Sequence, residues 1–194
     1  LPKYSQEGVV REVAPDPTSD NGKFYLKAVR VDENDTGDMP EVVWTETYAP
    51  DDSYEFDDTS FVVRLRADGV LERFEFEPQL VGNSESNKAL DFVGKRIEHL
   101  ELLQDRLAVL AGNRLTVSAT DEHNRFWKGS ALETLVTDPT SVGTSGNSST
   151  LRYAVFHNRD LLIFADDAQF KLDGSAALTP QTAALPRTTS NECS

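Results

Sequence analysis

The stretch Asp91–Ser118, DFVGKRIEHLELLQDRLAVLAGNRLTVS, decides the fold, because it returns in altered form at Ser149–Asp173. When His99–Ala111 is aligned with Tyr153–Ala165, at an offset of 54 residues, the apolar runs and the polar turns coincide. Each copy has an apolar strand, a polar pair, a second apolar run and a small polar turn that leads to a third strand. The pattern predicts a three-stranded antiparallel meander used twice.

A repeat of about 50 residues built from short strands is typical of a propeller blade or a related β array. The alternative is a chance likeness, because any two meanders share period-2 patterning and Asn, Asp or Gly turns. The sequence therefore predicts a mainly β fold of antiparallel meanders, with blade-like, propeller-type repeats.

Further strands are expected N-terminal to the repeat, and one short helix follows its first copy. The clearest hairpin joins Phe61–Arg66 to Val70–Glu77 through Ala67-Asp68-Gly69, which supplies the positive-φ residue that such turns need. The helix is predicted at Asp121–Val136, with apolar residues at helical spacing. The other expected strands are Gly8–Val13, which the turn Pro15-Asp16-Pro17 ends, Lys23–Val31 and Glu41–Tyr48.

Changes of composition along the chain predict three parts. Residues 1–80 form an acidic antiparallel β lobe, and residues 89–175 hold the two blade-like meanders, with the Gly/Asn/Ser-rich segment Val81–Lys88 between them. Thr137–Thr150 reads as a Ser/Thr/Gly loop, and residues 176–194 as an extended connector. The first residue is Leu and the last ones suggest no closing element, so we expect an internal part of a longer polypeptide.

The net charge of −14 argues against a protein that grips nucleic acid, because phosphate binding needs clustered Lys and Arg. Residues 1–88 contain 20 acidic and 9 basic side chains, whereas residues 89–194 contain 13 and 10. A surface past which DNA slides remains compatible with this acidity. The single cysteine, Cys193, allows no intrachain disulfide, and no apolar run approaches the ~20 residues of a membrane helix.

Neither a metal site nor a catalytic centre is predicted. Asp32, Asn34 and Gly37 match positions 1, 3 and 6 of an EF-hand loop, but Val43 stands where the bidentate Glu belongs, so a solvated loop between strands is favoured. Acids are so frequent in Asp51–Asp58 that no pair stands out, and a solvated strand edge is preferred.

The remaining candidates for chemistry also favour structural interpretations. His99, His123 and His157 lack the spacing of metal ligands, and Cys193 is placed in a loose tail. The loop Gly143–Gly146 lacks the ending of a phosphate-binding loop. Phe126 and Trp127 are interpreted as a plug for an apolar groove rather than a ligand platform. We therefore predict no enzyme and no cofactor.

A series of stretches, in order along nearly the whole chain, resembles the tail tubular protein B family, the nozzle proteins of short-tailed bacteriophages. These stretches are Leu1–Tyr4, Val43–Thr47, Arg66–Gly69, Phe92–Ile97, Gln104–Leu107 with Leu110–Gly112, Ser149–Val155, Asp160–Phe170 and Leu178–Pro180.

The resemblance implies an internal fragment of a virion tail protein that is assembled in the bacterial host cytoplasm. It implies a homo-oligomer, a hexameric ring in the full-length protein, below a tail adaptor protein and carrying the tail fibres. Phage DNA would pass through this ring without specific binding during ejection, and no catalytic residue carries over. The family's β-rich architecture includes a propeller.

Two other functions are compatible with the residues alone. A carbohydrate-binding or carbohydrate-active β module would need Trp44 and Trp127 exposed as stacking platforms. A propeller-type interaction domain of a cell is the third hypothesis, which association with cellular partners alone would favour.

Overall fold

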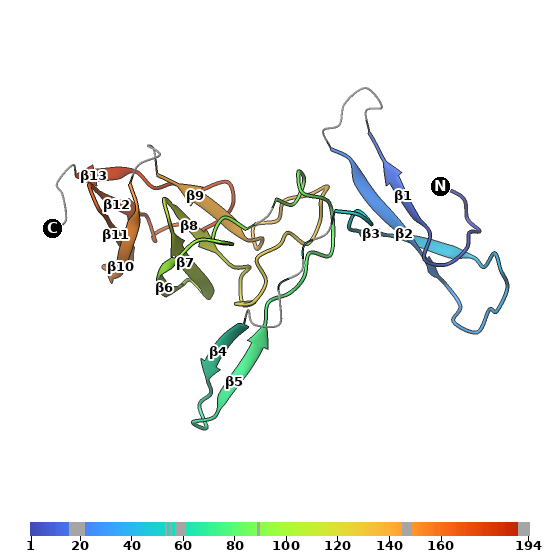
Figure 1. The fold of residues 1–194 in the computed structure, drawn as a ribbon, viewed down its shortest axis with the longest axis horizontal. Helices are drawn as coiled ribbons and strands as arrows, with labels where there is room; N and C mark the ends of the chain where they lie inside the picture. The colour runs from blue at the N-terminus through green and yellow to red at the C-terminus, as the bar shows by residue number, and fades with distance from the viewer. Residues whose placement is uncertain are drawn as a thin grey trace. The chain divides into compact units, whose positions relative to one another are not determined.

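The computed structural model describes residues 1–15, 22–52, 54, 56, 61–88, 90–144 and 149–189. The described residues form thirteen β-strands and no helix, and every strand pairing is antiparallel (Figure 1). The chain divides into two compact units. The expectation of a mainly β, antiparallel fold is confirmed.

Unit 1 consists of residues 1–55, 78–88 and 128–134, and its centre is a three-stranded sheet. Strand β2 (Phe24–Arg30) lies between β1 (Val10–Val13) and β3 (Val42–Thr47). The three strands predicted in this part of the chain are therefore present.

The segments 78–88 and 128–134 are tied into unit 1 by two buried amides. The Gln79 side chain donates to the carbonyls of Val81 and Asn87, and it accepts the Tyr54 N–H at 3.1 Å. Asn87 accepts the Lys128 N–H at 3.2 Å and donates to the Lys128 carbonyl at 3.4 Å. Because buried polar groups need partners, these two residues fix the path of an otherwise irregular chain.

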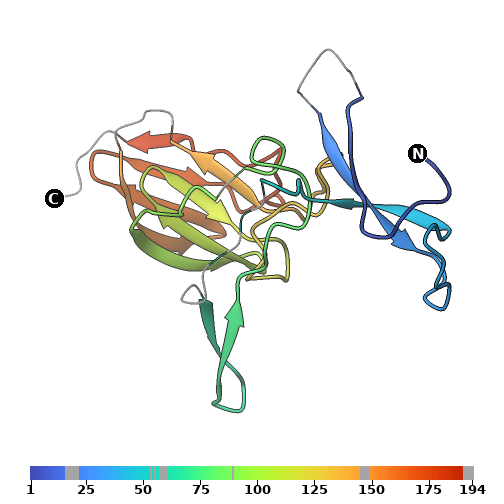
Figure 2. The ribbon, with the colours of Figure 1, turned by 45° about the vertical axis from the view of Figure 1, so that its right-hand side comes forward.

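Unit 2 contains a two-stranded hairpin and two four-stranded sheets, which Figures 1 and 2 show from two directions. The hairpin pairs β4 (Phe61–Leu65) with β5 (Leu71–Glu75). The first sheet has the order β6 (Ile97–Leu103), β7 (Arg106–Ala111), β8 (Arg114–Val117), β9 (Thr140–Gly143). The second has the order β10 (Leu151–His157), β11 (Asp160–Ala165), β12 (Gln169–Leu172), β13 (Arg187–Thr189).

The internal repeat is confirmed in backbone detail. Strands β6 and β10, and likewise β7 and β11, begin and end 54 residues apart. Both first hairpins turn through two residues of positive φ, Gln104-Asp105 and Asn158-Arg159, which is the signature of a type I′ turn. Both first strands also shift register near their start, between Ile97 and His99 and between Leu151 and Tyr153.

The two four-stranded sheets share one hydrophobic core. Alternate residues of each meander point inward, so Leu110 and Leu115 of the first sheet and Leu161 and Ile163 of the second are almost fully buried. Burying each such side chain contributes about 1.5–3 kcal/mol. The sequence repeat therefore produces two similar sheets that bury their apolar faces against each other.

The turns of the two repeats also hold the segment that follows β12. The Gln104 side chain donates to the carbonyls of Gly174 and Ala176 and accepts the Leu178 N–H at 2.8 Å. Gly174 packs so tightly that a Cβ atom there would lie 1.7 Å from the Arg159 carbonyl oxygen. Only glycine fits this contact, and it locks the second turn to the start of the connector.

The predicted helix at Asp121–Val136 is wrong. Asp121 adopts a φ of 64°, and the chain then forms turns in which polar side chains bind the backbone. The Ser130 hydroxyl accepts the N–H groups of Leu132 and Glu133, at 3.1 and 3.2 Å. The apolar residues at helical spacing suggest one helix face, but Trp127 is instead buried, with its ring beside the Phe56 ring. Local side-chain hydrogen bonds thus outcompete the helix.

Each predicted three-stranded meander gains a fourth strand. Strand β9 lies inside Thr137–Thr150, where the sequence predicts a loop, and β13 lies inside the predicted connector 176–194. The described residues form no propeller, and they show two four-stranded sheets around one core instead. The division at residues 1–80, 89–175 and 176–194 stays a prediction. Some residues of the predicted features lie outside the described residues, namely Asp16, Pro17, Asp57, Asp58, Gly146 and Cys193.

Candidate assembly surfaces

An aromatic cluster fixes the base of the β4–β5 hairpin within unit 2. The Phe76 ring, one residue after β5, lies 4.7 Å from the Phe56 ring and 5.7 Å from the Phe126 ring, measured between centroids. Phe92 and Phe126 meet edge to face at 5.1 Å. The Asn124 side chain also holds the end of β5, because it donates a hydrogen bond to the Glu75 carbonyl at 3.0 Å. The hairpin is therefore anchored at its open end.

The two faces of the hairpin differ in how their apolar residues are covered. On one face the Arg64 guanidinium lies 4.7 Å from the centre of the Phe74 ring and pairs with Glu72 at 3.1 Å. This arginine shields the aromatic ring from water. The opposite face, which we call the hairpin face, carries four exposed apolar side chains, Phe61, Val63, Leu65 and Leu71.

The hairpin face is least covered near the turn. Leu65 and Leu71 are paired directly across the two strands, and they expose 66% and 68% of their surface. Nearer the base, Arg73 lies 4.5 Å from the centre of the Phe61 ring and covers part of it. The tip thus presents uncovered aliphatic side chains to its surroundings.

A second exposed apolar surface follows the outermost strands of the two sheets. Within the described chain, β6 pairs only with β7 and β10 only with β11, while β6 and β10 lie close to each other. We call their exposed apolar residues the edge patch. It consists of Ile97, Leu100, Leu102, Tyr153 and Val155, which lie on the faces of β6 and β10 that point away from the shared core.

An ion-pair network joins the two edge strands. Arg152 of β10 donates to Glu98 of β6 at 3.0 Å and binds both carboxylate oxygens of Asp166, at 2.7 and 3.2 Å. Hydrogen bonding to Arg152 lowers the pKa of Asp166, and the two acids raise the pKa of Arg152. The bidentate pair with Asp166 holds the Arg152 guanidinium in one orientation, and one hydrogen bond from it to Glu98 links β10 to β6.

A buried arginine pins the irregular segment that follows β8. Arg106, 2% exposed, donates to the carbonyls of Ser118, Val136 and Asp138, each at 2.8 Å. Burial lowers the pKa of Arg106, because the charged form loses its hydration. One guanidinium thus ties β7 to both ends of the segment between β8 and β9.

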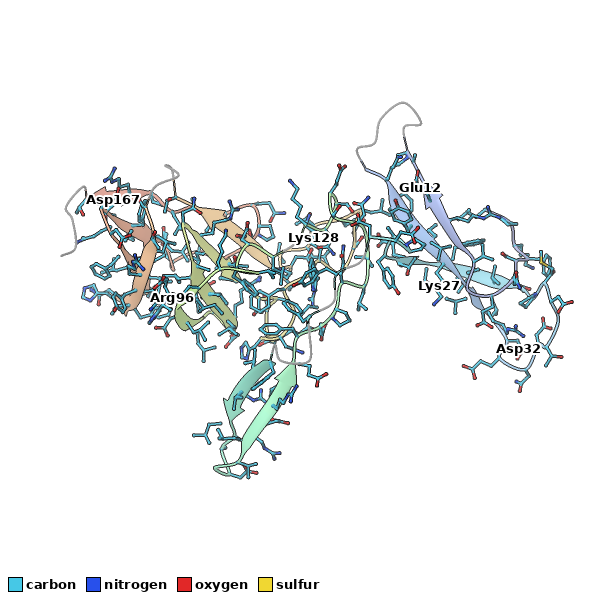
Figure 3. All side chains as sticks on the ribbon, in the orientation of Figure 1. Glu12, Lys27, Asp32, Arg96, Lys128 and Asp167 are labelled. Carbon is cyan, nitrogen blue, oxygen red and sulfur yellow. The ribbon has the colours of Figure 1, made fainter. Side chains whose placement is uncertain are left out.

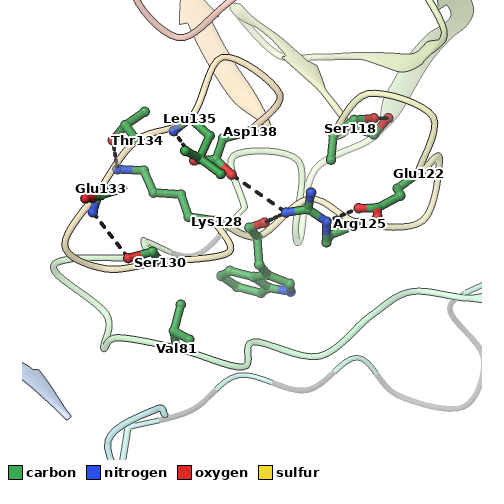
Figure 4. A network of polar contacts seen from close by, with 12 residues as sticks. Val81, Ser118, Glu122, Arg125, Lys128, Ser130, Glu133, Thr134, Leu135 and Asp138 are labelled. Atoms are coloured by element: carbon green, nitrogen blue, oxygen red, sulfur yellow. Dashed lines mark hydrogen bonds and ion pairs between the residues drawn. The ribbon is translucent and has the colours of Figure 1, made fainter. Parts of the chain in front are cut away.

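Arg125 and Asp138 add further polar contacts to the segment that Arg106 holds (Figure 4). Asp138 is almost fully buried, and its carboxylate accepts the Leu135 N–H at 2.7 Å. Arg125 lies 3.7 Å from the same carboxylate and also pairs with Glu122. This buried polar network determines the course of a segment that has no regular secondary structure.

The acidic loop with partial EF-hand spacing joins β2 to β3, as predicted. Its acids cap their own backbone: Asp32 accepts the Asn34 N–H, and Asp35 accepts the Gly37 N–H, each at 2.9 Å. Figure 3 labels Asp32 in this loop, and Val43, at the position of the missing ligand, belongs to β3. The described residues contain no group of three or more His, Cys, Asp or Glu that could hold a metal ion.

The three histidines lie at separate places in the fold. His99 of β6 is half-buried beside Glu101, with 3.7 Å between His99 Nε2 and Glu101 Oε2, and its ring contacts Tyr153. His157 ends β10, and His123 belongs to the turn after β8. In the described part of the chain, no helix is long and apolar enough to cross a membrane.

Neither tryptophan is arranged as an open stacking platform. Trp127 is 2% exposed, and its ring lies 6.4 Å from the Phe56 ring. Trp44 is half-buried, and its indole N–H donates to the Pro2 carbonyl at 2.9 Å. The interpretation of Phe126 and Trp127 as a buried plug agrees with these positions.

Comparisons with known proteins agree on one family. The family model described as "Bacteriophage nozzle protein" matches residues 1–194. A curated relative, "Tail tubular protein gp12" of Escherichia phage T7, is 28% identical over 194 residues. The match covers 97% of this chain and 23% of the relative, so the chain spans about a quarter of the length of that protein.

Proposed function

Since the chain belongs to the bacteriophage nozzle protein family and is a structural component of the virion tail, we propose that it forms part of the tail conduit for DNA ejection. The single observation that carries the proposal is the family match along all 194 residues. The relative's name, a tail tubular protein, supports a role in a tube wall. We assign the chain no enzymatic activity.

The proposed conduit is a homo-oligomeric ring, hexameric in the full-length protein, that also contacts a tail adaptor protein and the tail fibres. A tube built from one protein needs contacts between copies, and the exposed apolar residues at the hairpin face and the edge patch supply suitable surfaces.

The charge of the chain supports passage of DNA without specific binding. Its net charge is −14, and residues 1–88, with 20 acidic and 9 basic side chains, are the most acidic part. Affinity for DNA grows with the number of phosphates neutralised by Lys and Arg. A wall with excess acid would repel the phosphates and leave the polymer free to slide.

The two four-stranded sheets also fit the finer architecture inferred for the family. A propeller blade is a four-stranded antiparallel sheet, and a propeller takes about 4–8 of them. We propose that the sheets β6–β9 and β10–β13 are two such blades, which would require further blades outside residues 1–194. The burial of Trp127 and the hydrogen bond of Trp44 weigh against the carbohydrate-binding alternative.

Electron microscopy of the full-length protein, together with its mass in solution, tests the proposal. Hexameric rings with an open centre, and no retention of duplex DNA on the protein at low salt, are expected. A monomer that does not assemble even when an adaptor ring is added would overturn the conduit. Tight DNA binding that weakens steeply with salt would overturn passage without binding.

A further inference from the structure

The two four-stranded sheets of unit 2 use opposite faces for their mutual contact. The shared core contains Leu110 of β7 and Ile163 of β11. Strands β7 and β11 correspond at the repeat offset of 54 residues, so the counterpart of Leu110 is Phe164 and not Ile163. Because successive residues of a strand point to opposite faces, the first sheet buries one face in the core and the second sheet buries the other.

This contact is head to tail. We call the face that contains Leu110, or its counterpart Phe164, the front face of a sheet, and the other its back face. The front face of the first sheet packs on the back face of the second. Two counterparts also meet, since Arg152 donates to Glu98, 54 residues away, at 3.0 Å. Contact between like faces would close the pair, whereas a head-to-tail contact can be repeated by a further sheet.

The front face of the second sheet lacks the cover that the first sheet has. Leu110 is fully buried, but its counterpart Phe164 and the nearby Leu162 are only half-buried. On β10, Tyr153 and Val155 expose 63% and 53% of their surface. The register places Tyr153 opposite Phe164 and Val155 opposite Leu162, so the four side chains form one apolar block. The stack therefore ends on an apolar face that has the position of a buried one.

A second copy of residues 1–194 offers no free back face to match it. The back face of the second sheet is already occupied by the first sheet. On the back face of the first sheet, the paired residues Val109 and Thr116 are 2% and 4% exposed, so its centre is covered as well. The matching sheet must come from another part of the polypeptide, and this chain spans only about a quarter of the length of its curated relative.

We infer that a further four-stranded sheet of the same polypeptide, outside residues 1–194, packs its back face on the front face of the second sheet. Its residues at the positions of Leu161, Ile163 and Phe170 are apolar, because these three form the back face that the first sheet covers. The inference rests on the proposed function, in which the two sheets are blades, and names the surface that receives the next one. Tyr153 and Val155 are then covered within the subunit, which leaves the β6 residues of the edge patch and the hairpin face for contacts between copies.

Photochemical cross-linking in the full-length protein tests this contact. The photoreactive amino acid p-benzoylphenylalanine replaces Tyr153 during synthesis, and the aromatic ring that it retains suits the site. Irradiation should give a product of unchanged subunit mass, in which the probe is joined to a peptide outside residues 1–194. The matched control places the probe at Tyr4, a 53% exposed residue of unit 1, and should not join the same peptide.

The products distinguish the possible occupants. A product of doubled mass, a product with a different tail protein, a cross-link within residues 1–194 or no product at all would overturn the inference. Electron microscopy of the same preparations separates it from the conduit. Rings with any of these outcomes leave the conduit standing without the inference, whereas the expected product without rings leaves the inference standing without the conduit.

Thiol accessibility provides a readout that is independent of cross-linking. In the full-length protein with its native cysteines replaced by serine, Val155→Cys should react with a maleimide about tenfold or more slowly when folded than when unfolded in urea, because reaction requires an accessible thiol. Circular dichroism establishes that the variant is folded. A folded-state rate within about twofold of the rate in urea would show that Val155 faces solvent and would contradict the docking.

Discussion

Replacing Arg106 by Met should destabilise unit 2 by about 3–5 kcal/mol. The guanidinium donates three hydrogen bonds of 2.8 Å, to the carbonyls of Ser118, Val136 and Asp138. Bonds to a charged donor contribute about 1.5–3 kcal/mol each, or about 4–9 kcal/mol together. Recovering the hydration of a buried charge offsets several kcal/mol of this sum. Methionine fills much of the aliphatic volume, so a large cavity is not expected.

Urea denaturation measures the effect. With a slope of about 2 kcal/mol per molar urea, the unfolding midpoint should fall by about 2 M. Trp127 is buried in unit 2, so its fluorescence reports this unit once Trp44→Phe has removed the signal of unit 1. Coincidence of the fluorescence transition with the circular dichroism transition indicates whether the units unfold together.

Two matched variants complete the test. Arg66→Met also removes an arginine, but from an exposed ion pair with Asp68, and it should change the free energy of unfolding by less than about 1 kcal/mol. Arg106→Lys keeps the charge but not the planar fork, so it should lose most of the stabilisation. If Arg106→Met and Arg66→Met shift the midpoint equally, the buried arginine does not hold the segment between β8 and β9.

Three further predictions concern other contacts of unit 2. Gly174→Ala places a methyl group against the Arg159 carbonyl, and we expect this overpacking to cost about 3 kcal/mol. Calorimetry should then show a Tm lower by about 6–12 °C. An unchanged Tm would contradict the close packing of Gly174. The pKa of Asp166 is lowered by Arg152, so its stabilisation is present above about pH 4 and is lost as pH falls through the lower folded-state value. Asp166→Asn should therefore flatten the decline of stability in acid titrations, and an unaltered pH profile would count against the pair. Iodide should quench the fluorescence of Trp127 only weakly in the folded protein. Quenching as strong as in the urea-unfolded protein would instead favour the carbohydrate-binding hypothesis.

The sequence by itself determined the repeated meander. The turns at Gln104-Asp105 and Asn158-Arg159 are short and polar, and the flanking apolar alternation leaves one register that buries the core residues of both meanders. Strand pairs joined by two residues are local, so β6–β7 and β10–β11 could be predicted from pattern alone. The acidic loop at Asp32 could likewise be predicted from the sequence, because Asx turns form between residues that are neighbours in the chain.

The family could also be inferred from the order of stretches along the chain, whereas the candidate surfaces could not. Exposure of Leu65, Leu71 and Leu102 depends on which strands lie at sheet edges, and sequence alternation does not reveal that position. An apolar residue on an edge strand has the same local pattern as one in the core.

Tertiary structure alone decided the segment between β8 and β9, where a helix had been expected. The positive φ of Asp121, the burial of Trp127 and the hydrogen bonds of Arg106 arise from contacts between residues far apart in sequence. The fourth strands β9 and β13 are short and polar, so only pairing with β8 and β12 makes them strands. Local pattern sets an element when its partner lies a turn away, and long-range contacts set it when local preferences are weak.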